Sequence, residues 1–522
     1  MRPGLWEPPT ELSAAEAAVV QRIRRAKLFV FLRLYRHELF DEGFQAELAA
    51  TYKDSSLGQP PVPPAQLALA LVLQAYTGVS DDEVIEVMVM DRRWQLVLDC
   101  LDCTTPPFSK GTLVGFRQRL IAEHGDRRLI ERTVAVAGQH KVFGAGQLRA
   151  ALDSSPLWGA GRVEDTYNLM GHALRKALSV LARQQGRGLA AVAQEAGAGL
   201  LSASSLKAAL DLDWDDHAAR AHALGLILAE LDAVEAYVVA QAEPEAWGEG
   251  VSMSLATARQ VQAQDVTTDE QGQPVLRQGV AKERRISVED SQMRHGRKSK
   301  HRLFDGYKRH VLSDLDSGLV RAVGLTPANA PEASVTEALG ADLAYQEVAL
   351  CELHIDRAYL SSTWVRNRPP ELAIYCKAWP VRQGTRFAKP AFSLDWEQQR
   401  IRCPNAVEMP FVPGGVVHFP TERCRACTLR ERCTASTAGR SVSIHPDERL
   451  LQELRQRQLT PAGRAKLRQR TTVEHDLAHI GHWQGPRARY IGQRKNLFDL
   501  RRCAVVQNLH VLAHADRLAK AA

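Results

Sequence analysis

The sequence predicts an α/β protein in which a mixed sheet is preceded by an all-helical domain and interrupted by two insertions, one helical and one small and cysteine-rich. Three observations predict this. Helical periodicity fills the first 145 residues, acidic residues follow apolar runs typical of buried strands, and four of nine cysteines gather between Cys403 and Cys433. Because 522 residues exceed one compact core, several domains are expected.

The composition is that of a globular protein, with 45% hydrophobic and 24% charged residues, and it excludes a disordered or fibrous chain. No apolar run is long enough for a membrane span, and Met1 to Gly4 do not open a signal peptide, so we expect a cytoplasmic protein. The net charge of +7 is weak evidence for nucleic acid. Its basic residues cluster at 294–302 and 464–502, and such clusters are either phosphate contacts or solvated loops.

The first predicted domain spans residues 1–145 and is helical. An apolar helix is expected at Leu67–Tyr76, and Ser80 with Glu83 has the capping-box spacing that opens the next helix. Ser109 begins a further helix with basic positions. A small basic bundle is either a DNA-binding module or a generic bundle, and spacing does not decide between them.

The predicted sheet begins in the second domain, 146–365, which contains a helical insertion at about 166–245. Gln147–Leu152 predicts a strand that leads into Asp153, with Pro156 stopping the strand pairing. Further elements of this domain are expected as two strands, a helix and a buried strand: Phe304–Leu312, Gly318–Leu325, Ala333–Tyr345 and Glu347–Ile355. Asp356 follows the last of them.

Three acids have the placement of a metal site. Asp153 and Asp356 stand at the ends of predicted strands, where a rigidly held side chain faces the rim of the sheet. Glu474 lies in a helical segment of the closing domain, 461–522, which we expect to pack across the same rim. Mg²⁺ prefers carboxylate oxygens, although each acid alone is equally typical of a turn, a helix cap or a solvated surface.

The third predicted domain, 366–460, is an insertion with short strand-like runs at Val416–Phe419 and Ser441–Ile444. It carries four cysteines with the pattern C-x20-C-x2-C-x5-C: Cys403, Cys424, Cys427 and Cys433. The close pair favours a structural Zn²⁺ held by four thiolates. The alternative is four reduced thiols that pack together.

Several blocks, in order along the chain, carry a resemblance to a known family. They are Asp153-Ser154-Ser155-Pro156, Phe304-Asp305-Gly306-Tyr307-Lys308-Arg309-His310, Thr326-Pro327-Ala328-Asn329-Ala330-Pro331-Glu332, His354-Ile355-Asp356-Arg357-Ala358-Tyr359, Arg470 with Glu474, and Asn508-Leu509. Together they resemble the D-D-E transposases of bacterial insertion sequences, which have an RNase H-like catalytic core. Similar cysteines occur at the position of the cysteine cluster in related transposases, which supports the zinc site.

The resemblance implies a DDE transposase that cleaves DNA at insertion-sequence ends and joins the freed 3′-OH to target DNA. Asp153, Asp356 and Glu474 would hold two Mg²⁺ or Mn²⁺ ions, and Arg470 would stabilise phosphate charge. The implied partner is double-stranded DNA, both terminal inverted repeats and target, bound by a homodimer at the nucleoid. His310 and His475 are expected to be structural or DNA-contacting residues.

Two residues of the family signature are replaced, since Leu467 stands where a tyrosine is usual and Gly481 where a lysine is usual. We therefore expect DNA contacts from other basic residues: Arg297, Lys298, Lys300, Lys308, Arg487, Arg489, Arg494 and Lys495. Two alternatives stay open. One is an inactive DNA-binding regulator derived from a transposase, against which the intact triad argues. The other is a hydrolytic nuclease of the same fold, which the sequence separates poorly.

Overall fold

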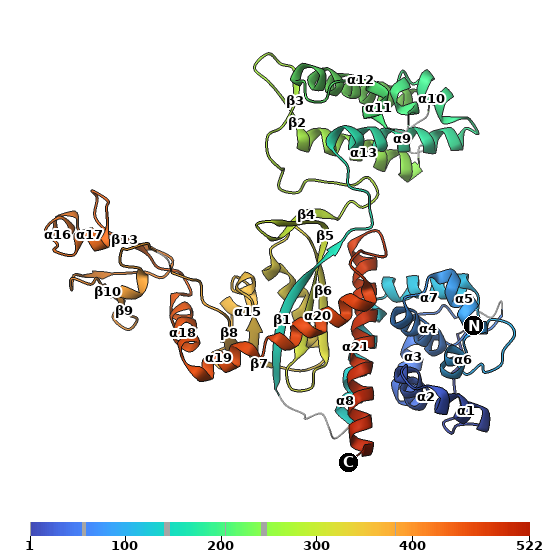
Figure 1. Cartoon of the computed structure of the whole chain (residues 1–522). Helices are drawn as coiled ribbons and strands as arrows, with labels where there is room; N and C mark the ends of the chain where they lie inside the picture. The colour runs from blue at the N-terminus through green and yellow to red at the C-terminus, as the bar shows by residue number, and fades with distance from the viewer. Residues whose placement is uncertain are drawn as a thin grey trace.

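The computed structural model describes residues 2–54, 59–139, 147–203, 205–241, 248–381 and 383–521. At its centre is a six-stranded mixed sheet in the order β4-β5-β1-β7-β8, with β6 beside β5 (Figure 1). The strands are β1 (Leu148–Trp158), β4 (Arg294–Ser299), β5 (Arg302–Asp314), β6 (Val320–Pro327), β7 (Leu350–Ile355) and β8 (Ala373–Tyr375). β5 runs antiparallel to β1, β4 and β6, whereas β7 runs parallel to both β1 and β8. This order is that of an RNase H-like core and confirms the predicted α/β class.

Strand β1 is longer than the sequence predicted. Pro156 does not stop the pairing, because it lies opposite Lys308 of β5 and the register continues to Trp158. The N–H of Trp158 points away from β5, toward the carbonyl of Pro486. Because N–H groups alternate along a strand, the nitrogen of Pro156 points to the same side, where the pairing with β7 has already ended at Leu152. The proline therefore removes no ladder hydrogen bond.

The other elements predicted for the second domain are present, with small shifts in their ends. β5, β6 and β7 match the three expected strands, and the expected helix is a 3-10 turn, η3 (Glu332–Val335), followed by α14 (Thr336–Ala344). Apolar residues of β1, β7 and α14 form one core with α18 (Glu448–Leu459) on one face of the sheet. The opposite face packs against α20 (Thr471–Gln484) and α21 (Gln493–Ala521).

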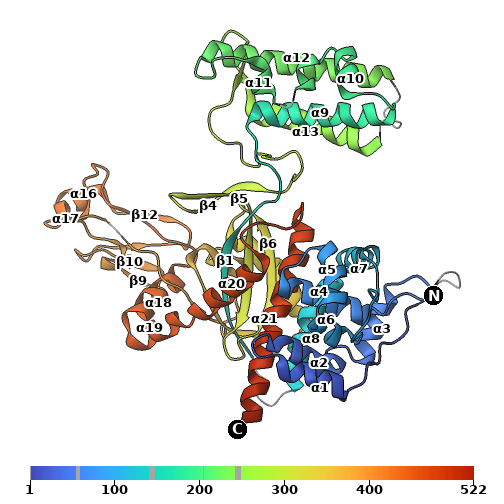
Figure 2. The same ribbon diagram turned by 45° about the vertical axis from the view of Figure 1, so that its right-hand side comes forward.

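The N-terminal region is helical, as predicted. Its helices are α1 (Ala14–Arg22), α2 (Lys27–Leu39), α3 (Glu42–Ala50), α4 (Pro64–Thr77), α5 (Asp81–Met90), α6 (Arg92–Leu98), α7 (Lys110–Ala122) and α8 (Gly125–Gln139). Ser80 and Glu83 form the expected capping box on α5, and Ser109 caps α7. Helix α21 lies between this bundle and the sheet (Figure 2), so both share one hydrophobic core.

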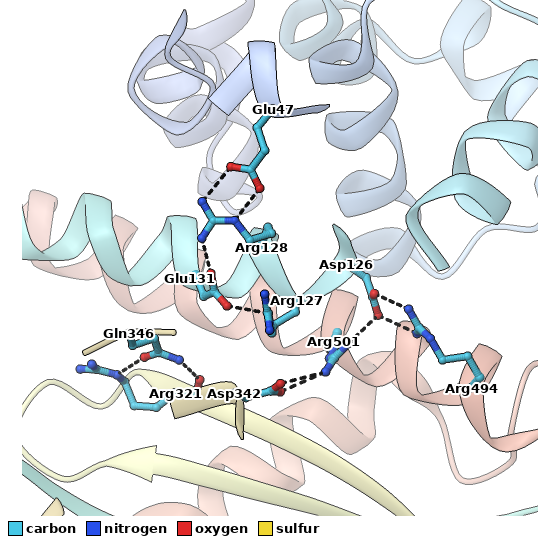
Figure 3. A network of polar contacts seen from close by, with 10 residues as sticks. All are labelled: Glu47, Asp126, Arg127, Arg128, Glu131, Arg321, Asp342, Gln346, Arg494 and Arg501. Carbon is cyan, nitrogen blue, oxygen red and sulfur yellow. Dashed lines mark hydrogen bonds and ion pairs between the residues drawn. The ribbon is translucent and has the colours of Figure 1, made fainter. Parts of the chain in front are cut away.

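Buried polar contacts join the bundle, α21 and the sheet. Asp126 of α8 is 1% exposed and accepts hydrogen bonds from Arg494 and Arg501 of α21, and Arg501 also binds Asp342 of α14 (Figure 3). Nearby, the side chain of Asn508 donates to Thr133 of α8 and to a β6 carbonyl. Breaking such buried pairs is costly, so these contacts fix how the three parts pack.

The helical insertion has a hydrophobic core of its own and stands away from the sheet (Figure 1). It comprises α9 (Thr166–Gln184), α10 (Leu189–Glu195), η1 (Gly199–Ser202), α11 (Leu206–Leu210), α12 (His217–Gln241) and α13 (Gly248–Asp265). Its predicted end near residue 245 falls outside the described residues, and α13 extends about twenty residues beyond it. A small hairpin, β2 (Val266–Thr268) and β3 (Pro274–Leu276), follows the last helix.

The cysteine-rich insertion also has its own small core, at the opposite end of the molecule from the N-terminal bundle (Figure 1). It is built from β9 (Ser393–Asp395), β10 (Arg400–Arg402), β11 (Glu408–Pro410), β12 (Val416–His418), β13 (Ser441–Ser443), α16 (Thr421–Arg425) and α17 (Arg430–Cys433). The two predicted strand-like runs pair as β12 and β13. Across the described ranges, no helix is long and apolar enough to cross a membrane.

The domain boundaries predicted from the sequence stay a proposal for how the chain divides. The first of them, at residues 145 and 146, lies outside the described residues.

Candidate active site

Asp153 and Asp356 lie side by side at one edge of the sheet. Leu152 and Ile355 are the last paired residues of the parallel strands β1 and β7, and each aspartate directly follows one of them. Paired strands run about 4.8 Å apart, so the two carboxylates leave neighbouring strands at the same level. Asp153 is not at the end of β1, as the sequence suggested, but at the end of its pairing with β7.

Arg470 joins the first aspartate to the glutamate. Its Nη1 lies 2.5 Å from Oδ2 of Asp153, and its Nη2 lies 2.6 Å from Oε1 of Glu474. Arg470 stands at the N-cap position of α20, the helix that crosses β1, and Glu474 lies one turn further along it. The predicted glutamate helix therefore does cross the rim of the sheet, and Arg470 forms ion pairs with two of the three proposed catalytic acids.

All three acids line one open cleft with about 1290 Å³ of empty space, part of it open solvent. Basic residues share its walls: Arg297, Lys298, Lys308, Arg309 and Arg470. A fourth carboxylate, Glu332, also lines the cleft, and sequence reasoning did not single it out. The sequence feature that could have identified Glu332 is its position directly after Pro331, at the start of η3 and inside one of the blocks that resemble the transposase family.

The electrostatics of the cleft reflect crowded acids at a half-buried site. Burial raises the pKa of Asp153, Arg470 opposes this shift, and the charge of Asp356 adds to it. Burial also raises the pKa of Glu332, Lys308 opposes this shift, and the charges of Asp153 and Asp356 add to it. Asp153, Asp356 and Glu332 are therefore close enough to interact, and binding of cations in the cleft would relieve their repulsion.

An ionic cluster holds the start of α20 in place. Glu352 of β7 accepts hydrogen bonds from Lys466 (2.7 Å), Arg149 (3.0 Å) and His354 (2.7 Å). Arg149 also donates to Gln469, the residue before Arg470. Burial alone would raise the pKa of Glu352, but these hydrogen bonds outweigh it and lower that pKa to about 2. Sequence reasoning did not identify this cluster.

Of the two histidines considered in the sequence, His310 is buried and His475 is exposed. The Nδ1 of His310 lies 2.7 Å from the Tyr359 hydroxyl, and its Nε2 lies 2.9 Å from the Thr326 hydroxyl. Burial, together with the smaller effect of the nearby Lys308 charge, lowers the pKa of His310 to about 3. His310 is therefore neutral and ties β5 to β6 and to the turn after Asp356.

The basic residues predicted to contact DNA fall into two groups. Six are exposed or line the cleft: Arg297, Lys298, Lys300, Lys308, Arg487 and Lys495. Lys308 in this group also donates to the carbonyl of Ala330. The other two lie outside the cleft lining and make internal contacts, since Arg489 donates to the carbonyl of Val79 and Arg494 binds buried Asp126 (Figure 3). These internal contacts favour a packing role for Arg489 and Arg494.

The N-terminal helix that begins after Ser109 uses one of its arginines for packing. Arg117 is 8% exposed, forms an ion pair of 2.7 Å with Asp81, and lies over the ring of Tyr490. A DNA-binding role for this domain stays a prediction.

The four clustered cysteines line a single small cavity in their insertion. Burial raises the pKa of Cys433, Arg440 opposes this shift, and the neighbouring thiols of Cys424, Cys403 and Cys427 add to it. All nine cysteines of the chain are free thiols. As the side chains stand, no three Asp, Glu, His or Cys residues of the described chain are arranged to hold a metal ion.

Comparison with known proteins gives two matches. A family model described as "Transposase DDE domain" matches residues 402–513, which include Arg470 and Glu474, and one described as "Transposase domain (DUF772)" matches residues 22–119, within the N-terminal bundle. No curated protein and no solved structure matches the chain. Both family models describe parts of transposases, which act on DNA, and they match this chain in its first and last parts. The two matches together support a DDE transposase of an insertion sequence.

Proposed function

We propose that the protein cleaves DNA at the ends of an insertion sequence and transfers the freed strand into target DNA. The observation that carries the proposal is the placement of Asp153 and Asp356 at the end of the β1–β7 pairing, with Glu474 on the same cleft. Three carboxylates from separate elements are the donor set that suits Mg²⁺ or Mn²⁺. Bound as a pair, such ions would supply activation of the attacking oxygen and stabilisation of the leaving oxygen.

The chain's own residues would position the metal ions and bind the DNA in this cleft. Asp153 and Asp356 are held by the sheet, and each accepts a hydrogen bond from the next backbone N–H, which fixes its orientation. Glu474 is half-exposed on a helix and is the acid that can move most easily. Arg297 and Lys298 of β4 form no ion pair or side-chain hydrogen bond within the described chain, so both can bind DNA phosphates.

A homodimer on DNA is part of the proposal, because two element ends have to be brought together for one transfer.

The four cysteines would hold a structural Zn²⁺ in their insertion. Four thiols around one cavity are the donor type and number that structural zinc takes. Such an ion would stabilise a core of only seven buried apolar side chains: Phe392, Ile401, Phe411, Val417, Phe419, Val442 and Ile444.

The test uses purified full-length protein, Mg²⁺ and a labelled duplex carrying the inverted repeats that flank the gene. We expect nicking at the 3′ end of the element, and a drop of about a thousandfold or more in Asp153→Asn, Asp356→Asn and Glu474→Gln, because several kcal/mol of metal-ion stabilisation is lost. Glu453→Gln, a half-exposed acid of α18 outside the cleft, is the matched control and should cleave normally.

The same assay separates the competing functions. Nicking that depends on the three acids but never yields joined products would indicate a hydrolytic nuclease. Binding of the repeats without cleavage, with Mg²⁺ or Mn²⁺ present, would indicate a DNA-binding regulator. Full cleavage by any one acid variant would remove that residue from the site.

A further inference from the structure

The guanidinium of Arg470 occupies the space between two carboxylates that the proposed function assigns to metal binding. It donates from Nη1 to Asp153 and from Nη2 to Glu474, at 2.5 and 2.6 Å. The Arg470 side chain is 25% exposed, the Asp153 side chain 16% and the Glu474 side chain 49%. Charge-assisted hydrogen bonds of this length, partly shielded from water, are among the stronger polar contacts in proteins.

Both oxygens of Asp153 already accept hydrogen bonds. Oδ1 accepts from the backbone N–H of Ser154 at 2.8 Å, and Oδ2 accepts from Arg470. The N–H of Ser154 belongs to the paired strand β1 and cannot move without disturbing the sheet. Arg470 is a long side chain on the first turn of a helix and can move. Each oxygen keeps a second lone pair, but a cation beside Oδ2 would meet the positive charge of the guanidinium, so a cation that coordinates Asp153 directly competes with Arg470.

A divalent ion would also leave Arg470 near a DNA phosphate. The cleft holds four carboxylates and is lined by basic side chains, and its mouth is open to solvent. Once metal neutralises Asp153 and Glu474, the guanidinium no longer has an anionic partner on either side. A phosphate of the bound DNA strand is then an anion whose shape suits its planar donors.

We propose that Arg470 is a placeholder cation. In the metal-free protein it neutralises Asp153 and Glu474 and holds the site closed to metal, and it passes to a DNA phosphate when divalent ions take those oxygens. This inference rests on the proposed function, which assigns the acids to metal. It adds that metal and DNA each strengthen the binding of the other through one side chain, because coupling between two ligands is reciprocal.

The test measures binding of Ca²⁺ to the full-length protein by titration calorimetry, without DNA and with an uncleaved repeat duplex. We expect Arg470→Gln to bind Ca²⁺ about tenfold more tightly than the wild type in the absence of DNA, since removing a competing cation worth about 1.4 kcal/mol changes the affinity by that factor. Arg470→Lys carries the charge on a shorter side chain with a single donor nitrogen, so its Ca²⁺ affinity should lie between those of the wild type and Arg470→Gln. Arg468→Gln, an exposed arginine on α19 (Pro461–Arg468), is the matched control.

The second readout is the coupling itself. DNA should tighten Ca²⁺ binding to the wild type and to Arg468→Gln, and should tighten it much less in Arg470→Gln. Equal or weaker Ca²⁺ binding by Arg470→Gln and Arg470→Lys than by the wild type, or undiminished coupling in Arg470→Gln, would overturn the placeholder role and leave the metal site standing. Ca²⁺ binding that Asp153→Asn leaves unchanged, or its absence from every protein, would overturn the proposed function as well.

Discussion

A single neutral imidazole connects three parts of the core around the candidate site. His310 of β5 contacts Thr326 of β6 and Tyr359 of the turn that follows Asp356, at 2.9 and 2.7 Å. It is fully buried, so protonation inside the folded protein is strongly disfavoured and its pKa falls to about 3. In the unfolded chain the same group would titrate at its usual value of 6.5.

His310 should therefore make the stability of the core depend on pH. Between pH 6.5 and about 3 the unfolded chain binds a proton that the folded chain does not, so stability falls as the pH falls. From pH 7 to pH 5 this one group should cost about 2 kcal/mol. The variant His310→Gln can still bond both hydroxyls but does not titrate. Its free energy of unfolding should therefore fall by about 2 kcal/mol less than that of the wild type between pH 7 and pH 5. Urea unfolding of both proteins at pH 7 and pH 5 measures this difference, and hydrogen exchange of the β5 amides reports it locally. Equal losses of stability in the two proteins would contradict the role of His310.

At the residue scale, local patterns in the sequence carry more information than contacts between distant segments. The position of Asp356 after a strand was readable from a local apolar run, whereas Asp153 lies within β1 and only its pairing with β7 ends beside it. The ion pair between Arg470 and Asp153 spans 317 positions of sequence, and Glu332 reaches the cleft only because η3 packs beside the turn after Asp356. Neither juxtaposition leaves a local pattern in the sequence.

At the scale of elements, the sequence predicted the strands and the capped helices better than it predicted the residues at which they begin and end. Ser80 and Ser109 begin helices as predicted, Ser80 with the capping box that its spacing to Glu83 indicated, because capping is a local hydrogen bond. The predicted end of β1 was wrong, because a proline breaks a strand only where its nitrogen faces a paired neighbour, and that of Pro156 does not. The crossing of β1 by α20 depends on Glu352 and its three partners, which come from β1, β7 and α19.

The cysteine-rich insertion carries the prediction that belongs to this scale. The protein purified without chelator should contain about one zinc per chain, because four thiols surround one cavity. Chelation, or Cys427→Ser, should remove the zinc and unfold this insertion, since its core is too small to fold alone. The sheet should stay folded, because it has a separate core.

Cys100→Ala, in the N-terminal bundle, is the control and should keep the metal. Elemental analysis and limited proteolysis between residues 385 and 445 give the two readouts. Less than half an equivalent of zinc in the wild type would show that the thiols merely pack.

The whole molecule is organised by which parts share a core. The N-terminal bundle, α20, α21 and one face of the sheet bury their apolar side chains together. The helical insertion and the cysteine-rich insertion each bury theirs alone. The sequence could predict that these parts exist, from periodicity and cysteine spacing. It could not predict that α21 would be enclosed between the bundle and the sheet, because its contacts span long stretches of sequence, 375 positions from Asn508 to Thr133 of the bundle and 188 to Val320 of the sheet.

Two deletions should therefore have opposite effects. The helical insertion leaves and re-enters the core at one place, since the hydroxyl of Thr166 donates to Asp265 at 2.8 Å. Replacing residues 167–264 by a short glycine linker should change the stability of the remaining chain by less than about 1 kcal/mol, a few degrees in melting temperature. Removing residues 2–139 should instead leave the buried face of α21 in water, with Leu509 stripped of its packing against the bundle and Asn508 without its hydrogen bond to Thr133. That truncated chain should aggregate or lose the native hydrogen exchange of β6, whereas a stable, monodisperse product with protected β6 amides would contradict the shared core.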